Sequence, residues 1–255
     1  MVPLPEVDLH EARVVLCDAD GNLFPSEEPA FVASVQVTNR FLAEHRVDRT
    51  YGAEELRLAA TGMSYRVVLA TLAREHGVPP PARDELERWV EAEKEAVTAH
   101  LREVLRPDPD VLGPLAALAE HRGLAAVSSS ADARIAACFQ VTGMAGWFPP
   151  ARRFSAEDSL AVPTSKPDPA IYAYALNALG LQPTQAVAVE DSGTGATSAV
   201  AAGIPTIGNL QFVQPAERKE RRQVLHEVGV SVIVETWAEV VHLLGRPGEP
   251  GPPVL

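Results

Sequence analysis

The chain has 255 residues, of which 46% are hydrophobic and 22% charged, a composition typical of globular proteins with a large buried core. The formal net charge of −12 argues against nucleic acid or an anionic membrane as a partner. Two cysteines without a disulfide framework favour a reducing compartment, and no apolar run is long enough for a membrane span. The first residues lack the basic and apolar regions of a signal peptide, so we expect a cytoplasmic protein.

The first predicted element is a buried strand over residues 13–18, based on the apolar run at 14–17. Asp18 and Asp20 lie at its end. Side chains repeat every second residue in a strand, so the two carboxylates point the same way, and Gly21 allows a sharp turn beyond them. Two such carboxylates repel unless a cation neutralises them, and Mg²⁺ prefers carboxylate oxygens. We therefore expect a Mg²⁺ site at the end of this strand.

A long helical block follows. From residue 30 to 106 the pattern is helical, with breaks at Thr61-Gly62-Met63-Ser64 and at three prolines, residues 79–81. No strand signal occurs in about eighty residues. We expect residues 25–106 to form a separate helical domain, inserted after the first strand.

Beyond residue 106, predicted helices and strands alternate. The expected helices lie at 111–121, 133–143, from Pro167 to about 180, 193–202, 216–228 and 237–244. The expected strands lie at 124–127, near 153–154, and at 186–189, 204–207 and 230–234. This alternation predicts an α/β fold with a doubly wound, Rossmann-like, mostly parallel sheet. The core domain would comprise residues 1–24 and 107–245, and the proline-rich tail 246–255 is expected to be disordered.

Polar residues follow several of these strands, where ligands bind in open α/β sheets. Taken singly, each also fits a turn, a helix cap or a surface lysine. Their shared position at one edge of the sheet instead predicts a single crevice. The residues are Asp18, Asp20, Ser128, Lys166, Glu190 and Asp191.

This set of groups fits phosphoryl transfer. Asp18 is the candidate nucleophile, which would form an aspartyl-phosphate. Asp20 would protonate the leaving oxygen and later accept a proton from water. Ser128 and Lys166 would bind the transferring oxygens, where negative charge spreads in the transition state.

The acidic residues also form a candidate Mg²⁺ site. Asp18 and Asp191 would bind the ion by side chain, with a main-chain carbonyl near Asp20 completing the protein ligands. The candidate metal-binding residues are Asp18, Asp20, Glu190 and Asp191.

The sequence resembles the haloacid dehalogenase superfamily of phosphohydrolases. Its subgroup containing β-phosphoglucomutase and sugar-phosphate phosphatases is the most similar. The resemblance implies a Mg²⁺-dependent aspartyl-phosphate mechanism and a helical cap that closes over the site and selects the substrate. Asn22 is a departure, because threonine is usual there. The matching motifs are Asp18-Ala19-Asp20-Gly21, Ser128, Lys166-Pro167-Asp168-Pro169, and Glu190-Asp191-Ser192 with Gly195.

The substrate would be a small phosphorylated metabolite, such as a sugar or polyol phosphate. The candidate substrate-binding residues are Ser129, Thr61, Gly62 and Arg66. The mutase of this subgroup carries a lysine before the glycine of its cap loop, where this chain has Thr61, so a phosphatase is favoured. A phosphosugar mutase and a non-catalytic binding protein are the alternatives, and a monomer or dimer is expected. The charged run at residues 218–222 is expected to be a solvated helix face.

Overall fold

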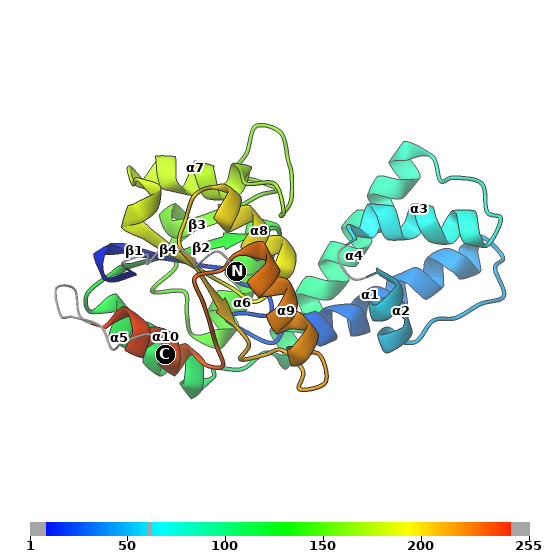
Figure 1. Cartoon of the computed structure of the whole chain (residues 1–255). Coiled ribbons are helices and arrows are strands. Elements are labelled where there is room, and N and C mark those ends of the chain that lie inside the picture. Colours follow the sequence, from blue (N-terminus) through cyan, green and yellow to red (C-terminus); the bar gives the residue numbers. More distant parts are fainter. Residues whose placement is uncertain (1–8, 61–62, 246–255) are drawn as a thin grey trace. The chain divides into compact units, whose positions relative to one another are not determined.

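The computed structural model describes residues 9–60 and 63–245 (Figure 1). Thr61 and Gly62, predicted to bind substrate, and the tail 246–255 lie outside the described residues. The chain divides into two compact units, with boundaries between Phe24 and Pro25 and between Leu105 and Arg106. We call residues 25–105 the cap unit and the remainder the core unit.

The core unit is built on a parallel sheet, whose six strands in the described residues have the order β3-β2-β1-β4-β5-β6. Strand β1 lies centrally, with Leu16 beside Ala125 of β2 and Ala188 of β4. Such strands are covered on both faces, which explains their continuous apolar runs. The strands are β1 (Val14–Cys17), β2 (Gly123–Ser128), β3 (Arg153–Ser155), β4 (Ala186–Glu190), β5 (Thr206–Asn209) and β6 (Val232–Val234).

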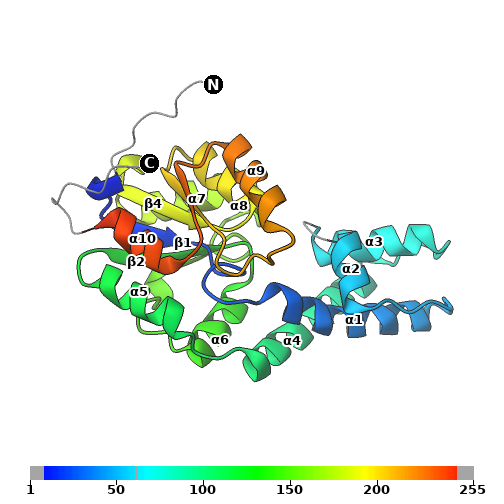
Figure 2. The ribbon, with the colours of Figure 1, turned by 60° about the horizontal axis from the view of Figure 1, so that its bottom comes forward.

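Helices cover both faces of this sheet. Figures 1 and 2 show α7, α8 and α9 on one face and α5, α6 and α10 on the other. Ile171 and Tyr172 of α7 pack with Leu16 in the apolar layer of the first face. The helices are α5 (Pro109–Ala119), α6 (Asp132–Thr142), α7 (Ala170–Leu179), α8 (Gly193–Ala201), α9 (Arg218–Val228) and α10 (Trp237–Leu244), with short 3₁₀ turns at Leu9–Glu11, Pro150–Arg152 and Pro183–Gln185.

The predicted α/β fold with a parallel sheet is confirmed, but several predicted element boundaries are shifted, two of them for a clear local reason. Pro167 does not open a helix: the Lys166–Pro167 peptide bond is cis and α7 begins at Ala170, whose N–H donates to Asp168 Oδ1 at 2.9 Å. Strand β5 begins at Thr206 rather than 204, because the Ile204 N–H still caps α8 by donating to Ala199 O at 3.1 Å. In both places a local turn takes the backbone hydrogen bonds that a helix or strand would use.

The regular elements described in the cap unit are all α-helices. They enclose their own apolar core, in which Phe41, Leu42 and Leu69 are fully buried. The ring of Trp89 meets that of Phe41 edge to face. The helices are α1 (Glu27–Glu44), α2 (Ala53–Ala60), α3 (Tyr65–Glu75) and α4 (Arg83–Val104). No helix in residues 9–60 and 63–245 has both the length and the apolar character that crossing a bilayer requires.

Candidate active site

Strand β1 and the turn after it present Asp18. Its N–H donates to Val189 O at 3.0 Å, which continues the parallel ladder to the end of the strand. The chain then turns at Gly21, whose φ of +77° favours glycine. A Cβ at Gly21 would also meet Asp191 Oδ2 at 2.8 Å. The glycine therefore permits both the turn and the close approach of Asp191.

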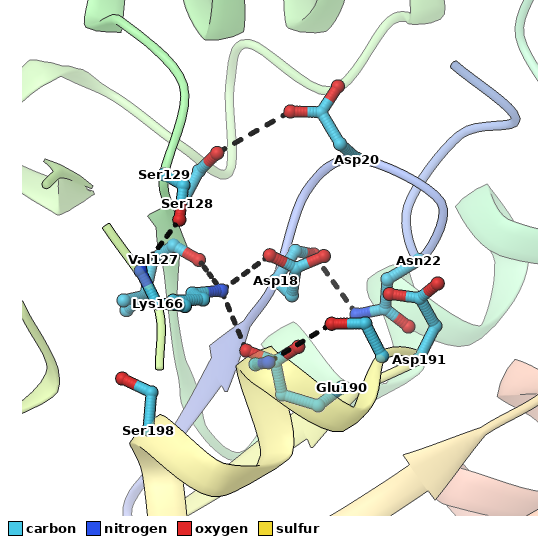
Figure 3. A network of polar contacts seen from close by, with 12 residues as sticks. Asp18, Asp20, Asn22, Val127, Ser128, Ser129, Lys166, Glu190, Asp191 and Ser198 are labelled. Carbon is cyan, nitrogen blue, oxygen red and sulfur yellow. Dashed lines mark hydrogen bonds and ion pairs between the residues drawn. The ribbon is translucent and has the colours of Figure 1, made fainter. Parts of the chain in front are cut away.

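Lys166 lies at the centre of the polar cluster (Figure 3). Its Nζ donates to Asp18 Oδ1 at 2.5 Å, to Glu190 Oε1 at 2.6 Å and to the main-chain oxygen of Val127 at 2.8 Å. These three bonds use the full donor capacity of an ammonium group. Only 5% of the Lys166 side chain is exposed, so the ion pairs are held away from bulk water.

Three buried carboxylates, those of Asp18, Glu190 and Asp191, each offer an oxygen within 4.8 Å of the others. Glu190 Oε1 also accepts a hydrogen bond from the Tyr172 hydroxyl at 2.5 Å, whereas the buried Oε2 has no partner among the described residues. Closely spaced hard oxygens with an unsatisfied buried lone pair fit a divalent cation such as Mg²⁺. The side chain of Asp20, also predicted to bind metal, is not part of this group.

Asp20 instead faces the end of β2 and the start of α6. Its Oδ2 accepts hydrogen bonds from the hydroxyls of Ser130 at 2.8 Å and Ser128 at 3.5 Å. Its Oδ1 accepts from Arg134 Nη2 at 3.0 Å. Ser130 and Arg134 were not predicted from the sequence. The available signal was their spacing. Ser130 and Arg134 are four residues apart, and residues at this spacing lie on the same side of a helix.

The remaining predicted residues that the structure describes each have a hydrogen-bonding or ionic partner. Ser128 is 1% exposed at the end of β2, and its hydroxyl accepts from the Ser130 N–H at 3.0 Å. Ser129 accepts from the main-chain N–H of Lys166 at 3.1 Å, which ties the lysine loop to β2. In the cap unit, Arg66 of α3 pairs with Glu87 of α4 at 2.5 Å.

Asn22, which replaces the usual threonine, is completely buried and well bonded. Its amide donates to Asp18 O at 3.0 Å and to Val189 O at 2.9 Å, and its Oδ1 accepts from Asn209 at 2.9 Å. Trp237 Nε1 donates to the main-chain oxygen of Asn22 at 2.8 Å. Asn22 thus joins the ends of β1, β4 and β5 beneath the site.

The prediction of a solvated face at residues 218–222 is wrong for Arg221. This arginine of α9 donates to the main-chain oxygen of Asp191 at 2.7 Å, and Nη1 lies 3.4 Å from Asp191 Oδ2. Helix α9 packs beside α8, so one side of the charged run reaches the end of β4. Arg218 and Arg222 pair with Glu235.

Burial raises the pKa of Asp18 well above its ordinary value. The ammonium of Lys166 lowers the pKa of Asp18 in part, whereas the negative charges of Glu190 and Asp191 raise it further. Burial would lower the pKa of Lys166, but Asp18 and Glu190 outweigh that effect and raise it. Lys166 therefore stays charged, while a cation bound among the carboxylates would favour ionised Asp18.

Gly195, in the first turn of α8, lies against the Glu190 carboxylate, and a Cβ there would overlap Glu190 Oε2. We expect Gly195→Ala to displace Glu190 and to destabilise the fold by about 1–3 kcal/mol, the usual cost of overpacking. Thermal unfolding measures this change. Gly146→Ala is the matched control, because a Cβ there meets nothing within 4 Å. Equal melting temperatures for the two variants would contradict the close approach.

A family model described as haloacid dehalogenase-like hydrolase matches residues 12–203, most of the chain. The chain belongs to this family. The resemblance drawn from the four motifs is thereby confirmed, and the protein is a hydrolase by family. Its matched range contains Asp18, Lys166 and Asp191, which are the residues of the polar cluster described above.

Solved structures of other proteins share the fold. CbbY from Rhodobacter sphaeroides, solved with phosphate, has a TM-score of 0.68 at 24% identity, covering 90% of this chain and 96% of that one. A predicted phosphoglycolate phosphatase from Haemophilus somnus has a TM-score of 0.70 at 19% identity, covering 91% and 97%. A curated CBBY-like protein of Arabidopsis thaliana is 52% identical over 46 residues, which are 18% of this chain and only 14% of that protein's length.

Proposed function

We propose that this hydrolase is a Mg²⁺-dependent phosphatase that acts on a small phosphorylated metabolite, a sugar or polyol phosphate, in the cytoplasm. The observation that carries the proposal is the buried Lys166 ammonium between Asp18 and Glu190, at 2.5 and 2.6 Å. This contact supports Asp18 as the nucleophile and Lys166 as the cation that binds phosphate oxygens. Support comes from CbbY of Rhodobacter sphaeroides, which has been solved with phosphate and with xylulose-1,5-bisphosphate. The two cysteines are buried and form no disulfide, which supports a location in the reducing cytoplasm.

The reaction has two steps on the chain's own residues. Asp18 attacks phosphorus, so that an O–P bond forms to its carboxylate while the bond to the leaving oxygen breaks and Asp20 gives that oxygen a proton. Asp20 then takes a proton from water, which attacks the aspartyl-phosphate and releases phosphate and Asp18. Asp20 thus enters the first step protonated and regains its proton in the second.

Lys166 and Ser128 bind the transferring oxygens in this proposal. The Lys166 ammonium already lies 2.5 Å from Asp18, which places positive charge beside the nucleophile. Mg²⁺, held by Asp18, Glu190 and Asp191 with the main chain at Asp20, would reduce the repulsion between the anionic nucleophile and the phosphate dianion.

Adding Mg²⁺ should stabilise the folded protein, because three carboxylates share a small volume with few cations. At a Mg²⁺ concentration of about 100 times Kd we expect a gain of about 2.7 kcal/mol, measured as a rise in melting temperature. Asp191→Asn should raise the melting temperature in EDTA by relieving repulsion, and should abolish most of the Mg²⁺ effect. Asp48→Asn, an exposed change, serves as control. An Asp191→Asn variant that keeps the full Mg²⁺ shift would argue against this ligand set.

Release of inorganic phosphate from a panel of sugar and polyol phosphates, with Mg²⁺ or with EDTA, tests the activity. We expect Mg²⁺-dependent release from at least one ester. Conversion of a hexose 1-phosphate primed by a bisphosphate, without net phosphate release, would instead indicate a phosphosugar mutase. Absence of both activities across the panel would favour a binding protein.

A further inference from the structure

Asp20 and its partners form a second ionic group beside the Lys166 cluster. The carboxylates of Asp18, Glu190 and Asp191 have Lys166 and Arg221 as nearby cations. Asp20 has its own cation, Arg134, with Nη2 at 3.0 Å from Oδ1. Figure 3 shows the Asp20 carboxylate turned toward the end of β2 and away from Asp18. The core unit thus keeps the fourth carboxylate apart from the other three.

The partners of Asp20 hold it at both oxygens. Oδ2 accepts from Ser130 at 2.8 Å, and Oδ1 accepts from Arg134. A charge-assisted bond from a guanidinium fixes direction as well as distance, because its N–H groups lie in a rigid plane. Arg134 is the third residue of α6, so a regular helix positions it. The side chains of Arg134 and Asp20 are 24% and 23% exposed, so the pair is partly open to solvent.

We propose that Arg134 is a positioning residue for Asp20, which directs the proton-shuttling carboxylate and keeps it from joining the Asp18, Glu190 and Asp191 group. The inference rests on the proposed function, because Asp20 is the proton shuttle only if the enzyme transfers phosphoryl groups. Without Arg134, the carboxylate loses its charged orienting contact and becomes available as an extra ligand for a cation bound at Asp18. Either change misplaces the shuttle relative to the leaving oxygen.

The test measures kcat and KM for phosphate release from the best ester of the panel. Arg134→Met should lower kcat by about 10- to 100-fold with KM nearly unchanged, since misplacement of a reacting group by about an ångström costs this much. Arg134→Lys should recover part of the loss, because an ammonium restores the charge without the planar geometry. Arg153→Met is the matched control: Arg153 pairs with Asp132 of the same helix at 2.8 Å, and its loss should leave kcat within about threefold.

A double-mutant cycle separates positioning from other roles. In an Asp20→Asn background, adding Arg134→Met should reduce kcat by less than about twofold, because both changes act through the same carboxylate. A full additional loss in that background, or a raised KM, would show that Arg134 contacts substrate directly and overturn the inference. Undiminished kcat in Arg134→Met would overturn it as well. Failure of the wild-type protein to release phosphate from any ester would instead reject the proposed function.

Discussion

Asp18→Asn should abolish phosphate release, with kcat reduced by at least about 10³-fold. The amide has nearly the shape of the carboxylate but cannot form the aspartyl-phosphate, so the loss reflects a missing nucleophile. The measurement is steady-state phosphate release with Mg²⁺ present.

The fold should survive this change. Lys166 keeps its bonds to Glu190 at 2.6 Å and to Val127 O at 2.8 Å, and one of three mutually repelling carboxylates becomes neutral. We therefore expect a melting temperature in EDTA at or above that of the wild type. Asp48→Asn makes the same chemical change at an exposed site and should keep full activity. Turnover of Asp18→Asn near the wild-type rate would reject this residue as nucleophile.

Lys166→Met should lower both stability and activity. Removing the ammonium leaves the buried carboxylates of Asp18 and Glu190 without the cation that they share. Breaking a buried ion pair on one side costs about 3–5 kcal/mol, which for a chain of this size lowers the melting temperature by roughly 6–20 °C. The measurement is thermal unfolding in EDTA, with Lys219→Met as the exposed control.

A second variant separates the electrostatic cause from poor packing of methionine. Adding Glu190→Gln to Lys166→Met removes one of the two uncompensated charges, so the double variant should melt higher than Lys166→Met alone. It should nevertheless remain inactive, because no ammonium binds the transferring oxygens. If Lys166→Met melts in EDTA at the wild-type temperature, then Lys166 does not stabilise the buried carboxylates.

Most of the strands could be predicted from the sequence because their signals are local. The apolar runs before Asp18, Ser128 and Glu190 mark buried parallel strands, and ligand-binding residues follow the ends of such strands. The α/β fold and the grouping of charged residues at one edge of the sheet followed from those runs, whereas the family came from the resemblance of the four motifs.

Other residues of the site depend on which side of a helix faces inward, and residues far apart in the sequence decide this. Arg134 meets Asp20 because α6 packs beside the sheet, and Arg221 meets Asp191 because α9 packs on α8. Tyr172 reaches Glu190 from α7. The sequence around each of these residues does not indicate whether its side of the helix faces solvent or the protein interior.

The sequence by itself determined the class of fold, the ends of strands β1, β2 and β4 and the types of chemical group available there. Only the tertiary structure decided how those groups divide into two ionic sets, one around Lys166 and one around Arg134. The physical reason is distance: periodicity and turn residues act over a few neighbouring positions, whereas the ion pair between Arg134 and Asp20 joins residues separated by 114 positions.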